Sequence, residues 1–446
     1  MEKKIQKLYN WSNTKFVNSK IFFPKNEGEL KKLFFQLLNK NKKFSIMGNG
    51  NTYGDSFLNP AGLTINTLNL NKIYEINLKK NFVEVGAGMH LNELLNLLLK
   101  KKRIINNIPG SYDVTIGGCI SSNVHGKDSF KFGIFGNNII SLKILDNRGK
   151  ILKISERNKK FIKYVGAYGA NGLILSAKIR ISKIKYNTLS VNTFKFNTLK
   201  ELLNLFEKEQ TTSYYMGAWI DHFSNDMRGI FKSSKWSKTN LKLKKIQKEY
   251  NLISKFIINF LYPFLRNFFV KRLFIRIINY IFFLISKDSK NSEVNFRDFY
   301  YPQEKYLPKH SLLYKNGKIN IQILIPKKNF TKHFLNILIL CKKYKYESWW
   351  LGIKKHTKTR FLHSFCLDGY DITLQWSKQY TNNKNFNKFY LKLINYMSKN
   401  DIIIYHSKDI LLNKKNFQKF KQSRIFEKIF LKRNQIFNNF IVKRLG

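Results

Sequence analysis

Hydrophobic and polar residues alternate with two different periods along the first 182 residues, which predicts a mixture of helices and strands. Apolar residues recur at helical spacing over 26–41 and 91–101, and Asn26 with Glu29 has the spacing of an N-terminal helix cap. Short runs rich in β-branched residues predict strands over 43–48, 63–68, 82–88, 139–152 and 166–182. The first half is therefore expected to be α+β.

The second half repeats this mixture with longer strands. Strand-like segments cover 186–196, 214–223, 319–326 and 370–376, and helical segments cover 199–210 and 330–344. This order is typical of a sheet with covering helices. Residues from 401 onward begin with another strand-like run and end in a basic helical stretch. We therefore predict three parts, with boundaries at 1–185, 186–400 and 401–446.

A basic and aromatic segment at 252–287 stands apart within the second part. Arg266, Lys271, Arg272 and Arg276 interrupt its apolar residues, so uncharged runs reach roughly ten residues, half of what a bilayer-spanning helix needs. Aromatic and basic residues in one helix suit the surface of a membrane. A buried helical pair or a subunit contact is the alternative.

Length, charge and cysteine content limit the kinds of protein that this sequence can encode. A chain of 446 residues favours two domains or subdomains. The net charge of +54 favours an anionic partner, although lysines spread over solvated faces explain much of it. The three cysteines form no CxxC pair, which argues against a zinc site or a disulfide framework, and we expect no metal. The N-terminus lacks the apolar run of a secretory signal, so a cytoplasmic location is expected.

Two glycine-rich segments carry the strongest functional signal. GNGNTYGD, residues 48–55, follows a predicted strand, and residues 109–138 contain Gly117-Gly118 and His125-Gly126-Lys127. Such segments occur where backbone lies directly against a ligand. The β-branched run before Gly117 predicts a strand entering a loop of exposed N–H groups, which suits a diphosphate. Neither segment has the pattern of a Rossmann fold.

The order of these motifs, followed by GANGLILSAKI, resembles the vanillyl-alcohol-oxidase superfamily with its PCMH-type FAD-binding domain. Within it, the chain looks like the decaprenylphosphoryl-β-D-ribose 2′-oxidases and, more distantly, the aldonolactone oxidases. The resemblance implies FAD held by two α+β subdomains in 1–185. It also implies an α+β substrate (cap) domain with a central antiparallel sheet in 186–400, and a C-terminal segment that returns to the FAD domain.

The resemblance also implies an activity. It is FAD-dependent oxidation of a secondary hydroxyl of a sugar, such as a polyprenyl-phosphate-linked pentose, as the oxidase half of a 2′-epimerisation in the synthesis of cell-wall or surface polysaccharide. A short-chain reductase would be the partner, and quinone or oxygen the electron acceptor. The basic segment at 252–287 would allow peripheral contact with the inner face of the plasma membrane.

Residue by residue, the resemblance assigns three sets of positions. The two candidate catalytic groups are His125 and Lys408, between which the choice of proton acceptor stays open. The FAD-binding set is Gly48, Asn49, Gly50, Asn51, Thr52, Tyr53, Gly54, Pro109, Gly110, Ser111, Thr115, Ile116, Gly117, Gly118, Ser121, Ser122, His125, Gly126, Gly172, Leu173, Tyr405 and Lys408. The substrate-binding set is Lys127, Trp219, Tyr314, Gln322, Lys354, Thr373 and Gln375.

Two departures from the family pattern matter. Asn51 stands where many members carry the histidine that binds FAD covalently, so we expect non-covalent FAD. Thr373 and Gln375 stand where the decaprenylphosphoryl-ribose oxidases carry a cysteine and an acid, which leaves the sugar open. Two other hypotheses remain: a soluble sugar-lactone oxidase of the D-arabinono-1,4-lactone type, and a basic nucleic-acid-binding protein.

Overall fold

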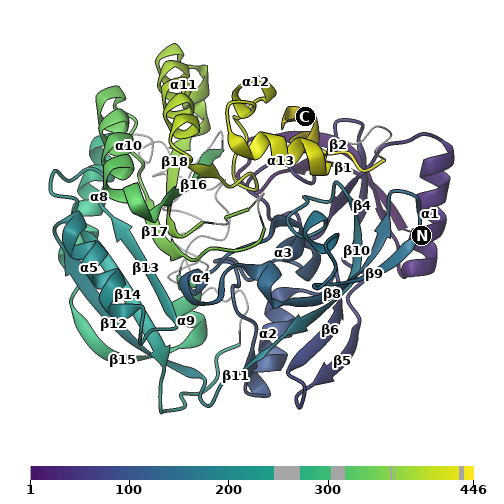
Figure 1. Cartoon of the computed structure of the whole chain (residues 1–446), viewed down its shortest axis with the longest axis horizontal. Coiled ribbons are helices and arrows are strands. Elements are labelled where there is room, and N and C mark those ends of the chain that lie inside the picture. Colours follow the sequence, from purple (N-terminus) through teal and green to yellow (C-terminus); the bar gives the residue numbers. More distant parts are fainter. Residues whose placement is uncertain are drawn as a thin grey trace.

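The protein is built from two groups of strands with the C-terminal segment beside the first group (Figure 1). The computed structural model describes residues 2–245, 272–302, 317–361, 364–365, 367–430 and 436–445. Tyr314 and most of the basic segment at 252–287 lie outside these residues, so what was expected of them stays a prediction.

The first group contains a four-stranded and a five-stranded sheet. The four-stranded sheet has the order β1 (Glu2–Tyr9), β2 (Phe16–Phe23), β4 (Leu63–Asn66), β3 (Ser45–Met47). The five-stranded antiparallel sheet has the order β5 (Ile73–Asn77), β6 (Phe82–Gly86), β10 (Gly172–Arg180), β8 (Ile139–Asp146), β9 (Ile151–Ser155). A short pair joins β7 (Arg103–Ile104) to β11 (Ser182–Lys183). The predicted strands of the first half are present, and β1, β2, β5, β7 and β11 were not predicted.

Both predicted helices of this half are confirmed. They are α1 (Glu27–Asn39) and α2 (Leu91–Lys100). The Asn26 side chain accepts a hydrogen bond from the backbone N–H of Glu29, as the capping pattern predicts. Leu30, Leu33 and Leu37 of α1 are buried, which follows the apolar spacing of its sequence.

The prediction for Gly117-Gly118 is wrong in one respect. These glycines lie in the first turn of helix α3 (Ile116–Ser122) and not in an open loop. The side chain of Thr115 caps the helix by accepting from the Gly118 N–H at 3.2 Å. Because the cap and the packing of Ile116 in the core stabilise a helix, the β-branched run at 114–116 does not continue as a strand. Helix α4 (Ser129–Phe132) follows shortly afterwards.

The second group is an eight-stranded sheet with the order β15-β12-β14-β13-β17-β18-β16-β19. The strands are β12 (Thr188–Phe196), β13 (Tyr215–Ile220), β14 (Gly229–Trp236), β15 (Ser289–Asn295), β16 (Lys318–Pro326), β17 (Leu351–His356), β18 (Gly369–Ser377) and β19 (Ile403–Ile404). The helices are α5 (Leu199–Glu209), α8 (Arg272–Ile285), α9 (Phe296–Tyr300), α10 (Phe330–Tyr344) and α11 (Lys384–Lys399). All its described pairings are antiparallel, as predicted for a central antiparallel sheet.

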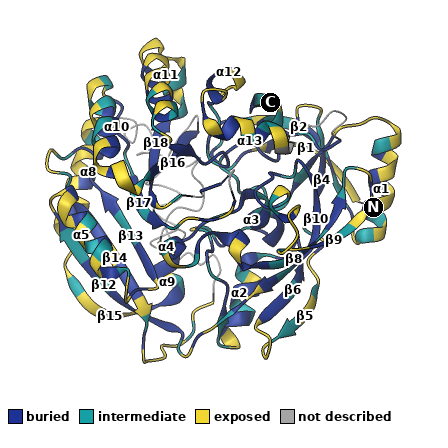
Figure 2. Ribbon diagram, viewed as in Figure 1, coloured by how far each residue is buried: buried dark blue, intermediate teal, exposed yellow. Residues whose placement is uncertain are grey.

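The alternation of residue types divides this sheet into an apolar and a polar face. In β16, Ile319, Ile321 and Ile323 are buried in the cluster that also contains residues of α5, α10 and α11. These helices show buried inner and exposed outer faces (Figure 2). The side chains between the isoleucines belong to the opposite face because successive residues of a strand alternate. That second face carries the polar residues described below.

The C-terminal segment contacts both groups of strands, since Phe417, Phe426 and Leu445 are buried in the same hydrophobic cluster as residues of β16 and α11. Helices α12 (Lys414–Phe417), α13 (Lys421–Phe430) and α14 (Phe440–Leu445) follow β19. Phe437 pairs with Phe44 beside β3, and the N–H of Phe440 donates to the carbonyl of Leu58. Arg444 binds Asp55 of the first glycine loop at 3.2 Å and Asp409 at 2.7 Å. Residues far apart in the chain thus meet beside the first glycine loop.

Candidate functional site

Hydrogen bonds from and to its carbonyl groups and side chains hold the first glycine loop, residues 48–55, in place. Asn10 and Ser12 donate to the carbonyl of Tyr53, and Asn66 donates to that of Gly48. Asn49 and Asn51 both donate to the carbonyl of Asp113.

The N–H groups of the loop are left open instead. Within the described residues, those of 48–52 meet no protein acceptor, whereas the Gly54 N–H donates to the Ser407 carbonyl at 2.8 Å. A Cβ at Gly48 would collide with Thr115 Oγ1, and Gly50 has a φ of 72°, so both positions require glycine. Open amides in a glycine loop fit an anionic diphosphate.

The second glycine segment leaves fewer backbone N–H groups free for a ligand than the sequence suggests. The N–H groups of Ile116 and Gly117 donate to Met89 and Ala87 carbonyls, and that of Gly118 to Thr115 Oγ1. The Ile116 side chain is fully buried in the core. The N–H groups of Ile116, Gly117 and Gly118 are therefore already engaged within the protein, and the assignment of these residues to the FAD-binding set stays a prediction.

The first residues of that segment, 109–111, remain free to contact a ligand. A Cβ at Gly110 would meet nothing within 4 Å, so open space lies beside it. The Ser111 hydroxyl is buried without a partner among the described residues. Pro109, Gly110 and Ser111 thus keep the features expected of a ligand-binding turn. A buried hydroxyl that lacks a partner is costly unless a ligand supplies one.

Gly172 and Leu173 lie at the start of β10. They pair with β8, whereas β10 pairs with β6 only over Ser176–Arg180. The Leu173 side chain is fully buried in a hydrophobic cluster. Any contact of these two residues with FAD would therefore be made by their backbone.

The His125 segment docks against the polar face of the eight-stranded sheet. Met216 of β13 donates its N–H to the Lys127 carbonyl at 2.9 Å, and Tyr405 donates its hydroxyl to the Ser122 carbonyl at 2.8 Å. The Tyr168 N–H donates to the Ser121 carbonyl. Helix α4 lies between the two groups of strands (Figure 1). Residues 121–127 and Tyr405 are therefore brought together, as the resemblance implies.

A buried polar network surrounds His125. Gln322 and Lys354 contact its two ring nitrogens, Nε2 at 3.2 Å and Nδ1 at 2.9 Å respectively. Asp371 Oδ2 lies 2.8 Å from Gln322 Nε2, 3.1 Å from Lys354 Nζ and 2.8 Å from His356 Nε2. Gln322 is completely buried, so it acts on the site through His125 and does not face a substrate directly.

Burial and neighbouring charges shift the pKa values in this network. Burial and the charge of Lys354 hold the pKa of His125 well below its usual value. Burial likewise lowers the pKa of His356, despite its hydrogen bond to Asp371. Burial alone would raise the pKa of Asp371, but Lys354 and His356 outweigh it and the pKa lies below the ordinary range. The network therefore holds neutral imidazoles around an ionised carboxylate.

Lysines gather around this network and repel one another. Burial and the charge of Lys354 lower the pKa of Lys408 to about 7, and the same two causes lower that of Lys127 to about 7. Lys318 is completely buried, and its pKa lies well below the usual value because of burial and the charge of Lys408. Lys318 and Lys408 Nζ lie 5.2 and 5.5 Å from the centre of the Tyr53 ring. The first glycine loop and the lysines therefore share one site.

The remaining predicted substrate residues divide into two groups. Thr373 and Gln375 lie on β18, with Gln375 Oε1 accepting from Lys318 Nζ at 3.2 Å. Trp219 instead packs edge-on against Phe282 of α8, with ring centroids 4.9 Å apart, in a hydrophobic cluster with Ile230 and Phe283. Trp219 does not join the polar network. Tyr314 lies outside the described residues.

Sequence reasoning missed Asp371, His356 and Lys318. Each has its signal in strand alternation: polar residues occupy 318, 320 and 322 in β16 and 371, 373 and 375 in β18. Because the residues between them are apolar, the polar side chains must share one face. A strand with apolar residues on one face and amide or charged residues on the other predicts a functional surface.

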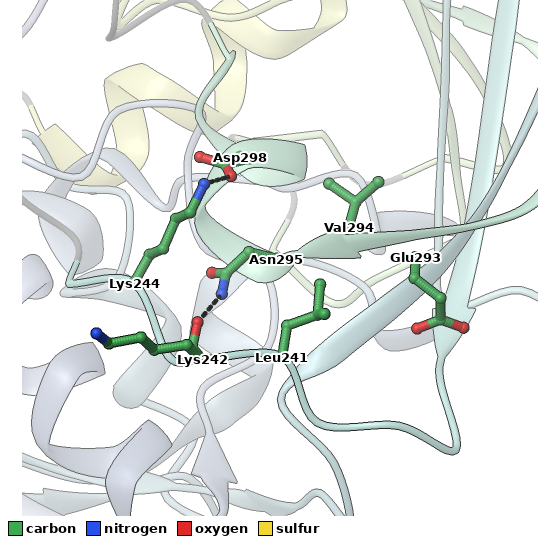
Figure 3. Close-up of a pocket in the computed structure, with 7 residues that line it drawn as sticks. All are labelled: Leu241, Lys242, Lys244, Glu293, Val294, Asn295 and Asp298. Carbon is green, nitrogen blue, oxygen red and sulfur yellow. Dashed lines mark hydrogen bonds and ion pairs between the residues drawn. The ribbon is translucent and has the colours of Figure 1, made fainter. Parts of the chain in front are cut away.

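A cavity of about 370 Å³ lies elsewhere, beside β15 and α9 (Figure 3). Its lining includes the Lys244–Asp298 ion pair at 2.6 Å, and the Asn295 side chain donates to the Lys242 carbonyl. These four lining residues thus form two polar pairs with one another. It includes no residue of the His125 network.

Comparison with known proteins identifies the domain that contains the first glycine loop. Residues 19–155 match the FAD-binding domain family, and this range contains both glycine segments. The chain carries an FAD-binding domain. The open amides at 48–52 and the unpaired Ser111 hydroxyl fit the FAD diphosphate, with no covalent attachment indicated. Of the earlier hypotheses, this favours the flavoenzymes.

Curated relatives match part of the chain. The chain is 30% identical over 181 residues to decaprenylphosphoryl-β-D-ribose oxidase of Mycolicibacterium smegmatis, covering 40% of this chain and 39% of that protein. It is 26% identical over 220 residues to L-gulonolactone oxidase of Mus musculus, covering 48% and 49%. The matches thus span between two fifths and half of the relatives' length.

Solved structures match over the whole chain. Cholesterol oxidase of Brevibacterium sterolicum superposes with a TM-score of 0.73 at 13% identity, covering all of this chain and 97% of that one. This likeness establishes the fold: an FAD-binding domain joined to a domain with a large antiparallel sheet.

Proposed function

We propose that the protein is an FAD-dependent oxidoreductase that oxidises a secondary hydroxyl of a phosphate-bearing sugar, such as a polyprenyl-phosphate-linked pentose. When bound, FAD supplies the acceptor for the hydride that leaves the sugar carbon. The observation that carries the proposal is the lysine cluster next to the first glycine loop. The similarity to decaprenylphosphoryl-β-D-ribose oxidase supports the same substrate class.

The charge balance of the site favours an anionic substrate. Burial and the charge of Lys354 lower the pKa of both Lys127 and Lys408, while Asp371 directly pairs with Lys354. A phosphate near Nζ of Lys127 and Lys354 would offset the repulsion between these two lysines. A neutral lactone offers no such compensation.

The geometry favours Lys408 over His125 as the acceptor of the hydroxyl proton. Both ring nitrogens of His125 already contact Gln322 and Lys354. A lysine with a pKa of about 7 is neutral in about half of the molecules at neutral pH. Lys408 is therefore the group that accepts the proton, and His125 lines the site.

A sugar-lactone oxidase is the second candidate, supported by the similarity to L-gulonolactone oxidase and to D-arabinono-1,4-lactone oxidase of Kluyveromyces lactis. Anaerobic mixing of the yellow, FAD-loaded protein with each substrate separates the two. Bleaching of the flavin by a polyprenyl-phosphoryl pentose, but not by the free sugar or by an aldonolactone, is the expected result. Bleaching by lactone alone would replace the first proposal with the second.

A matched pair of lysine variants tests the phosphate contact. Lys354→Met should slow flavin reduction by the phosphorylated sugar, whereas Lys358→Met, which changes an exposed lysine near the end of the same strand, should not. Equal rates in both variants would remove the role assigned to the lysine cluster. An absence of flavin from the reconstituted protein would overturn both candidate functions.

We also propose that α8 rests on an anionic membrane surface. Leu273, Ile277, Ile281 and Ile285 are all at least 48% exposed along one side of α8, and Arg276 lies between them. None of the helices in the described residues has the length and apolarity needed to span a bilayer. As part of this proposal, the protein lies peripherally on the cytoplasmic side of the membrane and has a short-chain reductase as its partner.

Vesicle sedimentation tests the membrane contact. The protein should sediment with phosphatidylglycerol vesicles, and replacement of Leu273, Ile277 and Ile285 by serine should weaken this more than serine at the exposed Ile339 of α10. Equal binding by both variants would assign the attraction to the general positive charge and overturn the role of α8.

A further inference from the structure

Four side chains form a closed ring of hydrogen bonds. Asp371 Oδ2 accepts from Gln322 Nε2 at 2.8 Å and from Lys354 Nζ at 3.1 Å. Gln322 Oε1 lies 3.2 Å from His125 Nε2, and Lys354 Nζ lies 2.9 Å from His125 Nδ1. The ring joins β16, β17, β18 and the turn after α3, and its carboxylate is completely buried.

The chemistry of the ring fixes the direction of every bond. An ionised carboxylate only accepts, so the NH₂ of Gln322 faces Asp371 and its oxygen faces His125. His125 Nε2 must then donate. An ammonium only donates, so His125 Nδ1 must accept from Lys354. Both sides of the ring lead independently to the same neutral imidazole, with its proton on Nε2.

His356 completes the support of the carboxylate. Its Nε2 lies 2.8 Å from Asp371 Oδ2, and its ring stands edge-on to that of His125 with centroids 5.0 Å apart. His125, His356 and Asp371 have the spacing of a metal site, with ligand atoms within 4.8 Å of one another. However, Lys354 Nζ is within 3.1 Å of both Asp371 Oδ2 and His125 Nδ1, so this ammonium already supplies a cation there.

We propose that Asp371 is a positioning residue that holds His125 in the Nε2–H tautomer, so that His125 donates a hydrogen bond and does not accept a proton. This inference rests on the proposed function in one respect, the presence of His125 in the site that binds the sugar. It explains why a buried carboxylate and a second histidine lie behind His125. An orienting carboxylate of this kind sets which nitrogen of an imidazole carries the proton.

Nitrogen NMR on the FAD-loaded wild-type protein tests the tautomer without any substrate. With ¹⁵N-labelled histidine, the His125 signals are assigned by their loss in His125→Asn. We expect one pyrrole-type signal from Nε2 and one pyridine-type signal from Nδ1 near neutral pH. A proton on Nδ1, or on both nitrogens, would overturn the proposal whatever the substrate proves to be.

Asp371→Asn then tests the cause, with Asp226→Asn at an exposed aspartate as the control. Loss of the carboxylate should mix the two tautomers and lower kcat about 10- to 100-fold with little change in KM, the scale of losing an orienting partner. An unchanged tautomer in Asp371→Asn would refute the role of Asp371. If that variant does not fold, the double variant Gln322→Met/Lys354→Met removes both side chains through which Asp371 acts on His125, and an unchanged tautomer there refutes it equally.

Activity separates the two conclusions. If the tautomer is as expected but no phosphorylated sugar reduces the flavin, the proposed function fails while the positioning role stands. If the sugar is oxidised but His125 is protonated on Nδ1, the reverse holds.

Discussion

At the scale of single residues, the site pairs a histidine that is fixed with a lysine that can titrate. His125 has both ring nitrogens engaged, whereas the Nζ of half-buried Lys408 lies 5.5 Å from the centre of the Tyr53 ring. Desolvation disfavours the charged form of a lysine, and the nearby Lys354 adds to this effect. The titration of Lys408 therefore falls near neutral pH.

This titration predicts a pH profile for the proposed oxidation. Because the pKa of Lys408 is lowered to about 7, the neutral amine increases as pH rises, and kcat/KM should increase up to about pH 7 and then level off. Lys408→Met should lower kcat/KM about 10²- to 10⁴-fold and remove this limb. Lys415→Met at an exposed lysine is the control. A limb that persists in Lys408→Met would show that another group accepts the proton.

Asn51 predicts how FAD is retained. Its amide donates to the Asp113 carbonyl and lacks a nucleophilic ring nitrogen. Acid precipitation of the holoprotein should leave the flavin in the supernatant. A yellow pellet after washing would contradict non-covalent binding.

At the scale of elements, strand alternation explains both stability and function. β16 places isoleucines against α10 and α11, and Lys318, Asn320 and Gln322 on the other side. Each strand of this sheet can thus contribute to the core and to the site at once.

A core variant of β16 tests this division. Ile323→Ala should lower the free energy of unfolding by about 2–5 kcal/mol through a cavity in the core. Ile5→Ala, at a residue 78% exposed, should change it by less than about 0.5 kcal/mol. Chemical denaturation followed by circular dichroism measures both. Equal effects would show that Ile323 is not part of a close-packed core.

The sequence predicted regular elements better than it predicted their ends. Periodicity located α1, α2, α5 and α10 because each has an apolar stripe, but the glycine pair in α3 concealed a helix that Thr115 caps. The ring around His125 was beyond reach because Gln322, Lys354 and Asp371 come from separate strands whose register no local pattern reveals. Its members Gln322 and Lys354 were found through resemblance alone.

At the scale of the whole molecule, residues near both ends of the chain reach the first glycine loop. Asn10 and Ser12 hold the Tyr53 carbonyl, while Arg444 joins Asp55 to Asp409, the neighbour of Lys408. Lys15 adds a second cation at 2.9 Å from Asp55. Ion pairs therefore join the first glycine loop, the residue next to Lys408 and helix α14.

Removal of Arg444 predicts a combined defect. Arg444→Gln leaves the buried Asp55 and Asp409 carboxylates without their shared cation and should destabilise the protein by about 3–5 kcal/mol. FAD should also dissociate more readily, because Asp55 belongs to the loop that binds it. Lys443→Gln, next to it and exposed, should affect neither melting temperature nor flavin retention. Full flavin retention in a destabilised Arg444→Gln would separate the ion pairs from the cofactor loop.

The Arg444 contact also constrains the order of events during biosynthesis. The ribosome adds Arg444 only after both glycine segments and the whole eight-stranded sheet have been made. Until then, Asp55 lacks one of its two cationic partners, and the ion pairs beside the first glycine loop are incomplete. Tight capture of FAD is thus expected after translation and not during it, so a cell short of riboflavin would accumulate the unloaded polypeptide, the form most exposed to proteases.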